Sequence, residues 1–247
     1  MYHYSWVQLA DGLVHAIEGL GLSHHDAVTM LSTWVVCFFL IGLALLGRLG
    51  LNKARAKGGT AQFQADRTLT MRNFWEMYTS ALFNLSRTVL SDKDSRTHFW
   101  LIGGLFAYIL SSNLLSVMPG GLPPTDNISN NAAMALTVFV VFNVAGVAQN
   151  GMGYFKHMAG PVWWLMPGLF LFELIGVVVR PASLSLRLMG NITGDHTVFG
   201  IMSDLVPLVI PCIFLSLGMF VSFLQAFVFT LLSVIYIGLS VAHDDDH

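Results

Sequence analysis

Charged residues are scarce in this sequence. Asp, Glu, Lys and Arg together make up only 11% of its 247 residues, whereas a soluble domain usually carries about 25%. Hydrophobic residues account for 55% of the chain, and its mean hydropathy is +0.66. So little polar surface cannot face water on all sides, and we therefore expect lipid to cover part of the molecule.

Cysteine is also rare, and the sequence lacks the common motifs of metal, catalytic and cofactor sites. Cys37 and Cys212 lie far apart, in no metal-binding or redox spacing. The sequence contains no His-Glu-x-x-His, no Gly-x-Ser-x-Gly and no cofactor-binding loop, so we expect no cofactor and no metal, and a membrane-embedded enzyme ranks last. The net charge of −2 argues neither for nor against nucleic acid, and we expect none as a partner.

Long apolar runs are what the sequence has instead. A bilayer core needs about 20 mostly apolar residues per helix. We therefore expect an all-α membrane protein with about five transmembrane helices plus interfacial amphipathic helices, its last two helices long and strongly tilted. The predicted single membrane domain, 1–247, comprises a first span 27–47, a cytoplasmic loop 48–97 with an amphipathic helix at about 70–90, a second span 98–118, a third span 132–154, a tilted helix 161–203 and a tilted last helix 205–242.

The distribution of basic residues predicts an orientation. Residues 1–47 and 119–131 contain no Lys or Arg, whereas nine of the twelve basic residues lie within 48–97. Basic loops stay in the cytoplasm, so this loop is predicted to face inward. The N-terminus then lies outside, and after five crossings the C-terminus lies in the cytoplasm.

One segment of that loop has the period of an amphipathic helix. Its apolar residues recur at steps of 4, 3, 4, 3 and 4, and they are Met71, Trp75, Tyr78, Leu82, Leu85 and Val89. Such a helix can lie flat on the cytoplasmic leaflet. An amphipathic helix packed on a partner subunit fits the pattern equally well.

Two arginines, Arg180 and Arg187, fall in the apolar C-terminal region rather than in a basic loop. An ionisable residue in hydrocarbon costs about 2.5–3.5 kcal/mol on insertion scales, so this region needs a water-filled path, a partner charge or both. Small residues such as Gly190 and Gly194 let another helix approach closely, either from this chain or from another subunit. The same stretch contains Glu173, Asn191, Asp195, His196 and Asp204.

Two motifs in this region are similar to those of a known family. The first comprises Glu173-Leu174-Ile175 and Arg180-Pro181-Ala182-Ser183-Leu184-Ser185-Leu186-Arg187-Leu188-Met189-Gly190-Asn191. The second is Leu224-Gln225-Ala226-Phe227-Val228-Phe229-Thr230-Leu231-Leu232-Ser233-Val234-Ile235-Tyr236-Ile237. Together they closely resemble subunit a of the ATP synthases, most specifically over about 170–240.

The resemblance implies the stator ion channel of a rotary ATP synthase in a bacterial-type inner membrane. In that family the last two helices form a tilted hairpin against a ring of c subunits. Two aqueous half-channels pass protons to and from the ring carboxylate, which couples ion flow to rotation and ATP synthesis. The implied partners are the c-subunit ring, the b-subunit peripheral stalk, the remainder of the complex and the lipid bilayer, and the chain by itself is not the catalyst.

Arg187 matches the family's essential arginine, which faces the ring carboxylate. A guanidinium group stays protonated in proteins, so it does not relay the proton itself. Its fixed charge favours the ionised form of a passing carboxylate. The alternative is a plain structural ion pair with Glu173 or another acid.

The resemblance assigns further residues to the two half-channels. Asn191 and Gln225 match polar positions near the arginine and the outer half-channel, although each amide also suits an interhelical hydrogen bond. His196 matches a titratable position of the outer channel, beside Asp195, which is either part of the path or a helix cap. Many members carry Glu or His seven residues before the glutamine, where this chain has Gly218, so the outer route would depend on His196, Asp195 and water.

Two residues belong to the other side of the membrane in this reading. Glu173 matches an acidic position associated with the cytoplasmic half-channel, and the predicted orientation places it toward the inner end of its helix. Arg180 matches a basic position seven residues further on, from which pairing with Glu173 is expected.

A secondary ion transporter with an intramembrane Arg and acid site is the main alternative function. Such proteins usually contain two related halves, and no internal repeat is visible in this short chain. Purification distinguishes the two, because a subunit a is recovered with a c-ring and a soluble ATPase head.

His196→Ala is expected to slow proton flux, more steeply at high pH, because a titratable group that collects protons matters most when bulk protons are scarce. The measurement is proton flux through the reconstituted complex over a series of pH values. A flux–pH curve unchanged from that of the wild type would remove His196 from the path.

Overall fold

The computed structural model describes residues 11–19, 21, 23–56, 70–117, 121–151, 176, 179, 182–183, 185–190, 193–194, 197–198, 200–201 and 209–241. Its elements are α1 (Asp11–Glu18), α2 (His24–Ala56), α3 (Met71–Arg87), α4 (Asp92–Val117), the 3-10 turn η3 (Pro124–Asp126), α5 (Ile128–Asn150) and α8 (Val209–Val241). The described residues between 176 and 201 are helical as well. With helices as the only regular elements of these ranges, the predicted all-α membrane fold is confirmed.

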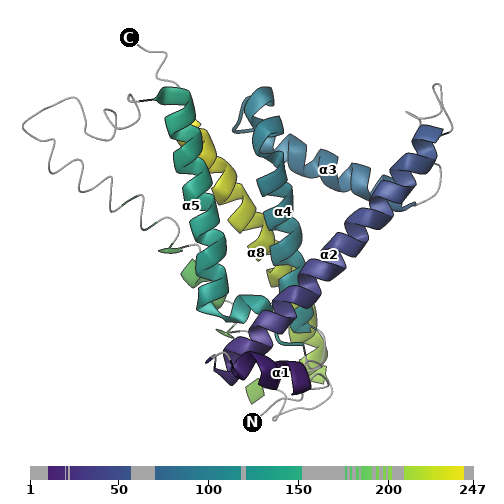
Figure 1. Cartoon of the computed structure of the whole chain (residues 1–247), viewed down its shortest axis with the longest axis vertical. Coiled ribbons are helices and arrows are strands. Elements are labelled where there is room, and N and C mark those ends of the chain that lie inside the picture. Colours follow the sequence, from purple (N-terminus) through teal and green to yellow (C-terminus); the bar gives the residue numbers. More distant parts are fainter. Residues whose placement is uncertain are drawn as a thin grey trace, which may run out of the picture.

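Four of these helices are long and apolar enough to cross a bilayer. The apolar segments are His24–Asn52 of α2, Asp92–Ser116 of α4, Ile128–Gln149 of α5 and Ile213–Val241 of α8. They run between the same two ends of the molecule, with α2 inclined away from the other three (Figure 1). The tilted helix predicted over 161–203 lies mostly outside the described residues, so a tilted hairpin with α8 remains a prediction.

Polar residues at the helix ends explain where the helices begin and stop. The Ser91 hydroxyl accepts a hydrogen bond from the Asp94 N–H (3.2 Å) and donates to the Asp94 carboxylate (2.7 Å), which caps α4. Asn127 caps α5 by accepting from the Ser129 N–H at 2.8 Å. α5 ends at Gly151, whose φ of 53° is readily adopted only by a residue without a side chain.

α8 packs against both α4 and α5, and the main core lies between these three helices. Phe142 of α5 and Phe229 of α8 are among its largest fully buried side chains. Edge-to-face ring contacts such as Phe106–Phe223 join α4 to α8. The buried members of this core are Leu82, Leu90, Leu101, Ile102, Leu105, Phe106, Ile109, Met134, Ala135, Val138, Phe142, Leu188, Ala226, Phe229, Val234 and Ile237.

α3 runs across the upper part of the molecule and contacts α2 and α4 (Figure 1). The Tyr78 hydroxyl donates a hydrogen bond to the Gly103 carbonyl of α4 at 2.5 Å, and burial raises the pKa of Tyr78 to about 12. Arg87 forms an ion pair with Asp92, which joins the end of α3 to the start of α4. The apolar surface of α3 extends beyond this docked side, because Met71, Phe74 and Met77 are exposed.

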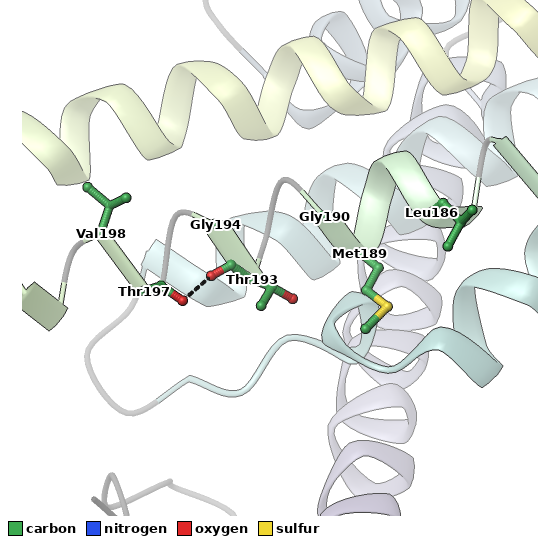
Figure 2. Close-up of a pocket in the computed structure, with 7 residues that line it drawn as sticks. All are labelled: Leu186, Met189, Gly190, Thr193, Gly194, Thr197 and Val198. Atoms are coloured by element: carbon green, nitrogen blue, oxygen red, sulfur yellow. Dashed lines mark hydrogen bonds between the residues drawn. The ribbon is translucent and has the colours of Figure 1, made fainter.

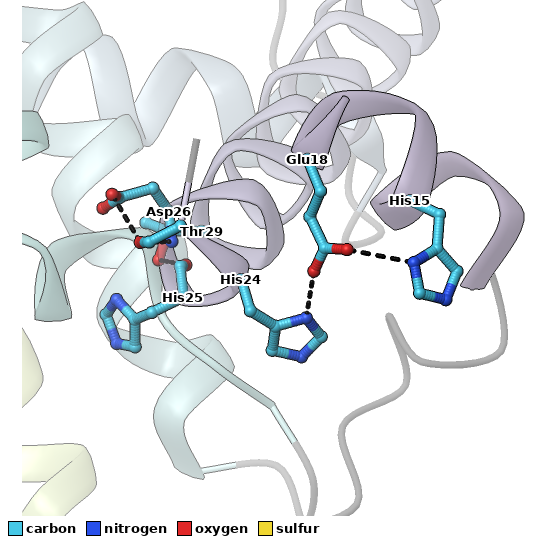
Figure 3. Close-up of polar contacts among 7 residues, drawn as sticks. His15, Glu18, His24, His25, Asp26 and Thr29 are labelled. Atoms are coloured by element: carbon cyan, nitrogen blue, oxygen red, sulfur yellow. Dashed lines mark hydrogen bonds and ion pairs between the residues drawn. The ribbon is translucent and has the colours of Figure 1, made fainter. Parts of the chain in front are cut away.

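α1 docks on the opposite end of the molecule, where α2 begins. Val14 packs with Ala27 and Val28 of α2. The Glu18 carboxylate forms hydrogen bonds with His24 (2.6 Å) and His15 (2.9 Å), and these bonds, the one with His24 foremost, lower the pKa of Glu18 (Figure 3). Within the described part of the chain, no three His, Cys, Asp or Glu residues are grouped as a metal site requires.

The contact between α2 and α3 depends on a glycine. A Cβ atom placed on Gly47 would overlap the indole Nε1 and Cδ1 of Trp75. Trp75 is held in this place by edge-to-face contacts with Phe74 and Tyr78, at ring-centroid distances of 5.8 and 5.5 Å. Its ring cannot give way without losing those contacts.

Gly47→Ala is therefore expected to destabilise the chain by about 1–3 kcal/mol, the usual cost of overpacking. Gly42→Ala on the same helix is the matched control, because a Cβ there meets no atom within 4 Å. That control should be neutral or slightly stabilising, since alanine is the better helix former. The measurement is the denaturation midpoint of each variant in detergent micelles, and equal midpoints would show that the Trp75 contact does not stabilise α3.

Candidate functional site

Of the seven residues that the sequence predicts for ion translocation, the structure describes Arg187 and Gln225. The other five lie outside the described residues, and their roles stay predictions. They are Glu173, Arg180, Asn191, Asp195 and His196.

Arg187 lies on the outward face of its helix. Residues 185–190 are helical, and within them Ser185 and Leu188 are buried whereas Leu186 and Arg187 are exposed. Leu188, which is 0% exposed, belongs to the same core as Ala226 and Phe229 of α8. The leucine therefore anchors the helix to the bundle, and Arg187, about 100° around the helix from it, is exposed.

Several exposed side chains along the described part of this helical stretch are apolar. The neighbouring side chain of Leu186 is 59% exposed, and Val198 and Ile201 are exposed further along the chain. None of the ion pairs formed between described residues includes Arg187. A permanent charge on an apolar face calls for a counter-charge or for water, as the hydrocarbon supplies neither.

A shallow groove of about 480 Å³ lies along the same helical stretch (Figure 2). The Thr197 hydroxyl in it is satisfied within the helical stretch, because its Oγ1 donates to the Thr193 carbonyl at 2.7 Å. Such small side chains allow another helix to approach closely. The lining residues are Leu186, Met189, Gly190, Thr193, Gly194, Thr197 and Val198.

Gln225 lies on α8 and is buried, with only 5% of its surface exposed. Ser222, one helical turn earlier, is buried as well, so a polar strip of α8 faces the bundle interior. Gly218, one turn earlier again, borders open space, since a Cβ there would meet no atom within 4 Å. The polar strip thus ends at a position that has room for water.

Sequence reasoning missed a buried polar junction beside this strip. Asn113 of α4 accepts a hydrogen bond from Thr125 Oγ1 (2.9 Å), and its amide donates to the Ser222 carbonyl of α8 (3.5 Å). The Asn131 amide of α5 donates to the Thr125 carbonyl at 2.7 Å. The available signal was an asparagine, preceded by two serines, inside an uncharged membrane span, because such a polar group is costly in lipid.

Some polar atoms next to this junction are buried without a partner among the described residues. They include Asn131 Oδ1 and Ser112 Oγ. Buried polar groups are almost always hydrogen-bonded, and ordered water usually satisfies those that the protein leaves open. The junction therefore fits a hydrated part of the bundle.

Comparison with known proteins decides the family. The family model described as "ATP synthase A chain" matches residues 30–238. This chain belongs to that family. It is 42% identical over 207 residues to "ATP synthase subunit a 2" of Syntrophotalea carbinolica, covering 83% of this chain and 82% of the relative. It is 35% identical over 242 residues to "ATP synthase subunit a" of Bdellovibrio bacteriovorus, covering 98% and 99%.

A third relative agrees with these two. "ATP synthase subunit a" of Geobacter sulfurreducens is 37% identical over 221 residues, which cover 90% of each chain. The match to the family reaches into each of the four described helices that are able to cross a bilayer, and it includes Arg187. The resemblance seen in the sequence is confirmed, and it disfavours the secondary transporter.

The two leucines that flank Arg187 provide a matched test of how this helix is oriented against the core. Leu188→Ala is expected to destabilise the chain by about 2–5 kcal/mol, because it leaves a cavity in the core. Leu186→Ala should change stability by no more than about 0.5 kcal/mol, because that side chain is exposed. Denaturation midpoints of the two variants in detergent check this, and a Leu186→Ala loss as large as that of Leu188→Ala would contradict the orientation.

Proposed function

We propose that this chain is the stator ion channel of a bacterial rotary ATP synthase. In this proposal two aqueous half-channels carry protons to and from the carboxylates of a c-subunit ring. Membership of the ATP synthase subunit a family supports the general role in proton conduction. The observation that carries the half-channel proposal is the exposure of Arg187 on a helix that Leu188 anchors to the core.

A fixed positive charge on that face has two effects on a passing ring. It attracts an ionised carboxylate by about 4 kcal/mol at 4 Å with an effective dielectric constant of 20, enough to favour proton release without trapping the ring. It also repels a cation that would otherwise pass straight from one half-channel to the other. Arginine suits this role because its guanidinium keeps its charge.

The two ends of the bundle differ in charge, which supports an orientation. α3 and the start of α4, at one end, carry Arg72, Arg87, Lys93 and Arg96. α1, the start of α2 and η3, at the other, carry no Lys or Arg among their residues. We propose that the first end faces the cytoplasm, with the N-terminus outside and the C-terminus inside.

This orientation places the buried polar strip of α8 in the outer half of the membrane. Gln225, Ser222 and the open space at Gly218 then border the outer half-channel. Asn191, Asp195 and His196 are proposed to line the same route, and Glu173 the cytoplasmic one, with Arg180 as its partner. These five assignments rest on the family resemblance.

The proposed partners follow from the same role. They are the c-subunit ring, the b-subunit peripheral stalk, the rest of the ATP synthase and the bilayer. In this scheme ATP is made elsewhere in the complex, and the chain itself contributes ion conduction.

Arg187→Ala is expected to abolish ATP-driven proton pumping while the complex still assembles, because the ring carboxylate loses its counter-charge and the two half-channels lose their barrier. The measurement is pumping into inverted membrane vesicles, normalised to assembled complex. Arg48→Ala is the matched control, an exposed arginine at the basic end of α2, and it should pump normally. Normal pumping by Arg187→Ala would refute the proposed function.

A further inference from the structure

The buried polar junction joins three elements, α4, η3 and α8, through the side chain of Asn113. Asn113 is only 2% exposed. Its Oδ1 accepts from Thr125 of η3, its Nδ2 donates to the Ser222 carbonyl, and its own carbonyl accepts from Ser222 Oγ at 3.4 Å. Through Thr125 the junction also includes Asn131 of α5.

The junction is tied to the outside of the bundle as well. Asp126 follows Thr125 in η3, and its carboxylate Oδ2 lies 3.7 Å from Nε2 of His25 in α2. The Asn127 amide donates to the Asp26 carboxylate at 2.7 Å. η3 is therefore held on one side by Asn113 and on the other by the first turn of α2, and it cannot shift without breaking bonds at both.

The part of the α4–α8 interface that precedes Asn113 on α4 is packed with apolar side chains. Ile109, one turn before Asn113 on α4, is fully buried, and Phe106 meets Phe223 with ring centroids 6.0 Å apart. Dispersion contacts of this kind have little directionality, and in lipid no hydrophobic force holds two helices in one register. Hydrogen bonds do have a direction, and they cross between the two helices at Asn113 and Ser222.

Gln225 follows Ser222 by one helical turn on the same buried strip of α8. A small rotation or slide of α8 at Ser222 would displace Gln225 by a similar amount. Misplacement of a reacting group by about 1 Å can lower a rate by up to about 100-fold. The register fixed at Ser222 thus decides where the amide of Gln225 lies.

We propose that Asn113 is a positioning residue that fixes α8 in register against α4 and η3, and thereby aligns Gln225 with the outer proton path. This inference rests on the proposed function, because Gln225 matters only if protons pass near it. Asn113 acts through α8 and need not touch the moving proton.

Asn113→Leu keeps the branching of the side chain at Cγ, with a larger volume, and removes its hydrogen bonds. We expect proton conductance per assembled complex to fall by about five- to tenfold, the effect of losing one or two buried hydrogen bonds. Thr125→Val should cause a smaller fall, because it removes only the bond to Asn113 Oδ1. Ser233→Ala is the matched control on α8, where the buried hydroxyl donates within its own helix, to the Phe229 carbonyl at 2.9 Å. Conductance of Asn113→Leu equal to that of Ser233→Ala would overturn the proposal.

Asn113→Asp separates positioning from simple packing, and it decides the question even if the leucine variant fails to assemble. A protonated aspartate has one acceptor and one donor, as the amide has, whereas an ionised aspartate has no donor for the Ser222 carbonyl. The ratio of its conductance to that of the wild type should therefore be near one at acid pH and fall as the pH rises. A ratio that stays constant with pH would overturn the proposal, since packing alone does not titrate.

Arg187→Ala in the same vesicles distinguishes the two proposals. If it blocks pumping while every Asn113 variant behaves as the Ser233→Ala control, the channel function stands and the positioning role fails. If Arg187→Ala pumps normally, the proposed function itself fails, and the positioning role fails with it.

Discussion

A hydrocarbon layer supplies no water to solvate a backbone amide or an ionised side chain, and every level of this chain reflects that constraint. Helices satisfy the backbone within each segment, and the described ion pairs lie toward helix ends, as Arg87–Asp92 does between α3 and α4. Arg187 departs from this pattern. Its charge lies on an exposed face beside an exposed leucine, while Leu188 holds the helix to the core. A charge placed in this way needs a counter-charge or water. In the proposed function a carboxylate of the c-subunit ring supplies the counter-charge.

Hydropathy predicts which segments cross the membrane, because a span is recognised from the apolar composition of one continuous stretch of sequence. It does not predict helix ends. The span expected at 27–47 lies within a helix that continues to Ala56, since a helix does not stop where the hydrocarbon does and arginine and lysine are good helix formers. α4 begins at Asp92, before the apolar residues of 98–118, because Ser91 caps it there. Such boundaries depend on single hydrogen bonds rather than on mean composition.

Contacts between distant residues were out of reach of sequence reasoning. Asn113 and Ser222 are 109 positions apart, and nothing in either segment identifies the other as its partner. The fit of Trp75 over Gly47 is equally hidden, since the period of α3 marks its apolar side chains and not the helix that receives them. The apolar residues predicted for one side of α3 were also an incomplete set. Phe74 and Met77 lie beside them on the helix, are apolar as well, and are exposed. Motif resemblance, by contrast, identified the family directly, because a family signature is local in sequence, and the role of Arg187 that follows from it stays a prediction.

The distribution of hydrogen bonds in the bundle suits the stator role proposed above. In that proposal a ring turning against this chain must meet a face without strong directional bonds, because each such bond would have to break at every step. The exposed side chains described in the helical stretch of Arg187 and on α8 are mostly apolar, and they include Leu186, Val198 and Ile201 together with Leu217 and Phe220 of α8, beside the hydroxyls of Thr193, Thr197 and Ser216. The directional contacts lie instead within the stator, where Asn113 joins α4, η3 and α8. In the proposed function, a mostly apolar face around the Arg187 charge and a hydrogen-bonded interior behind it would permit sliding while the charge and the proton path keep their alignment.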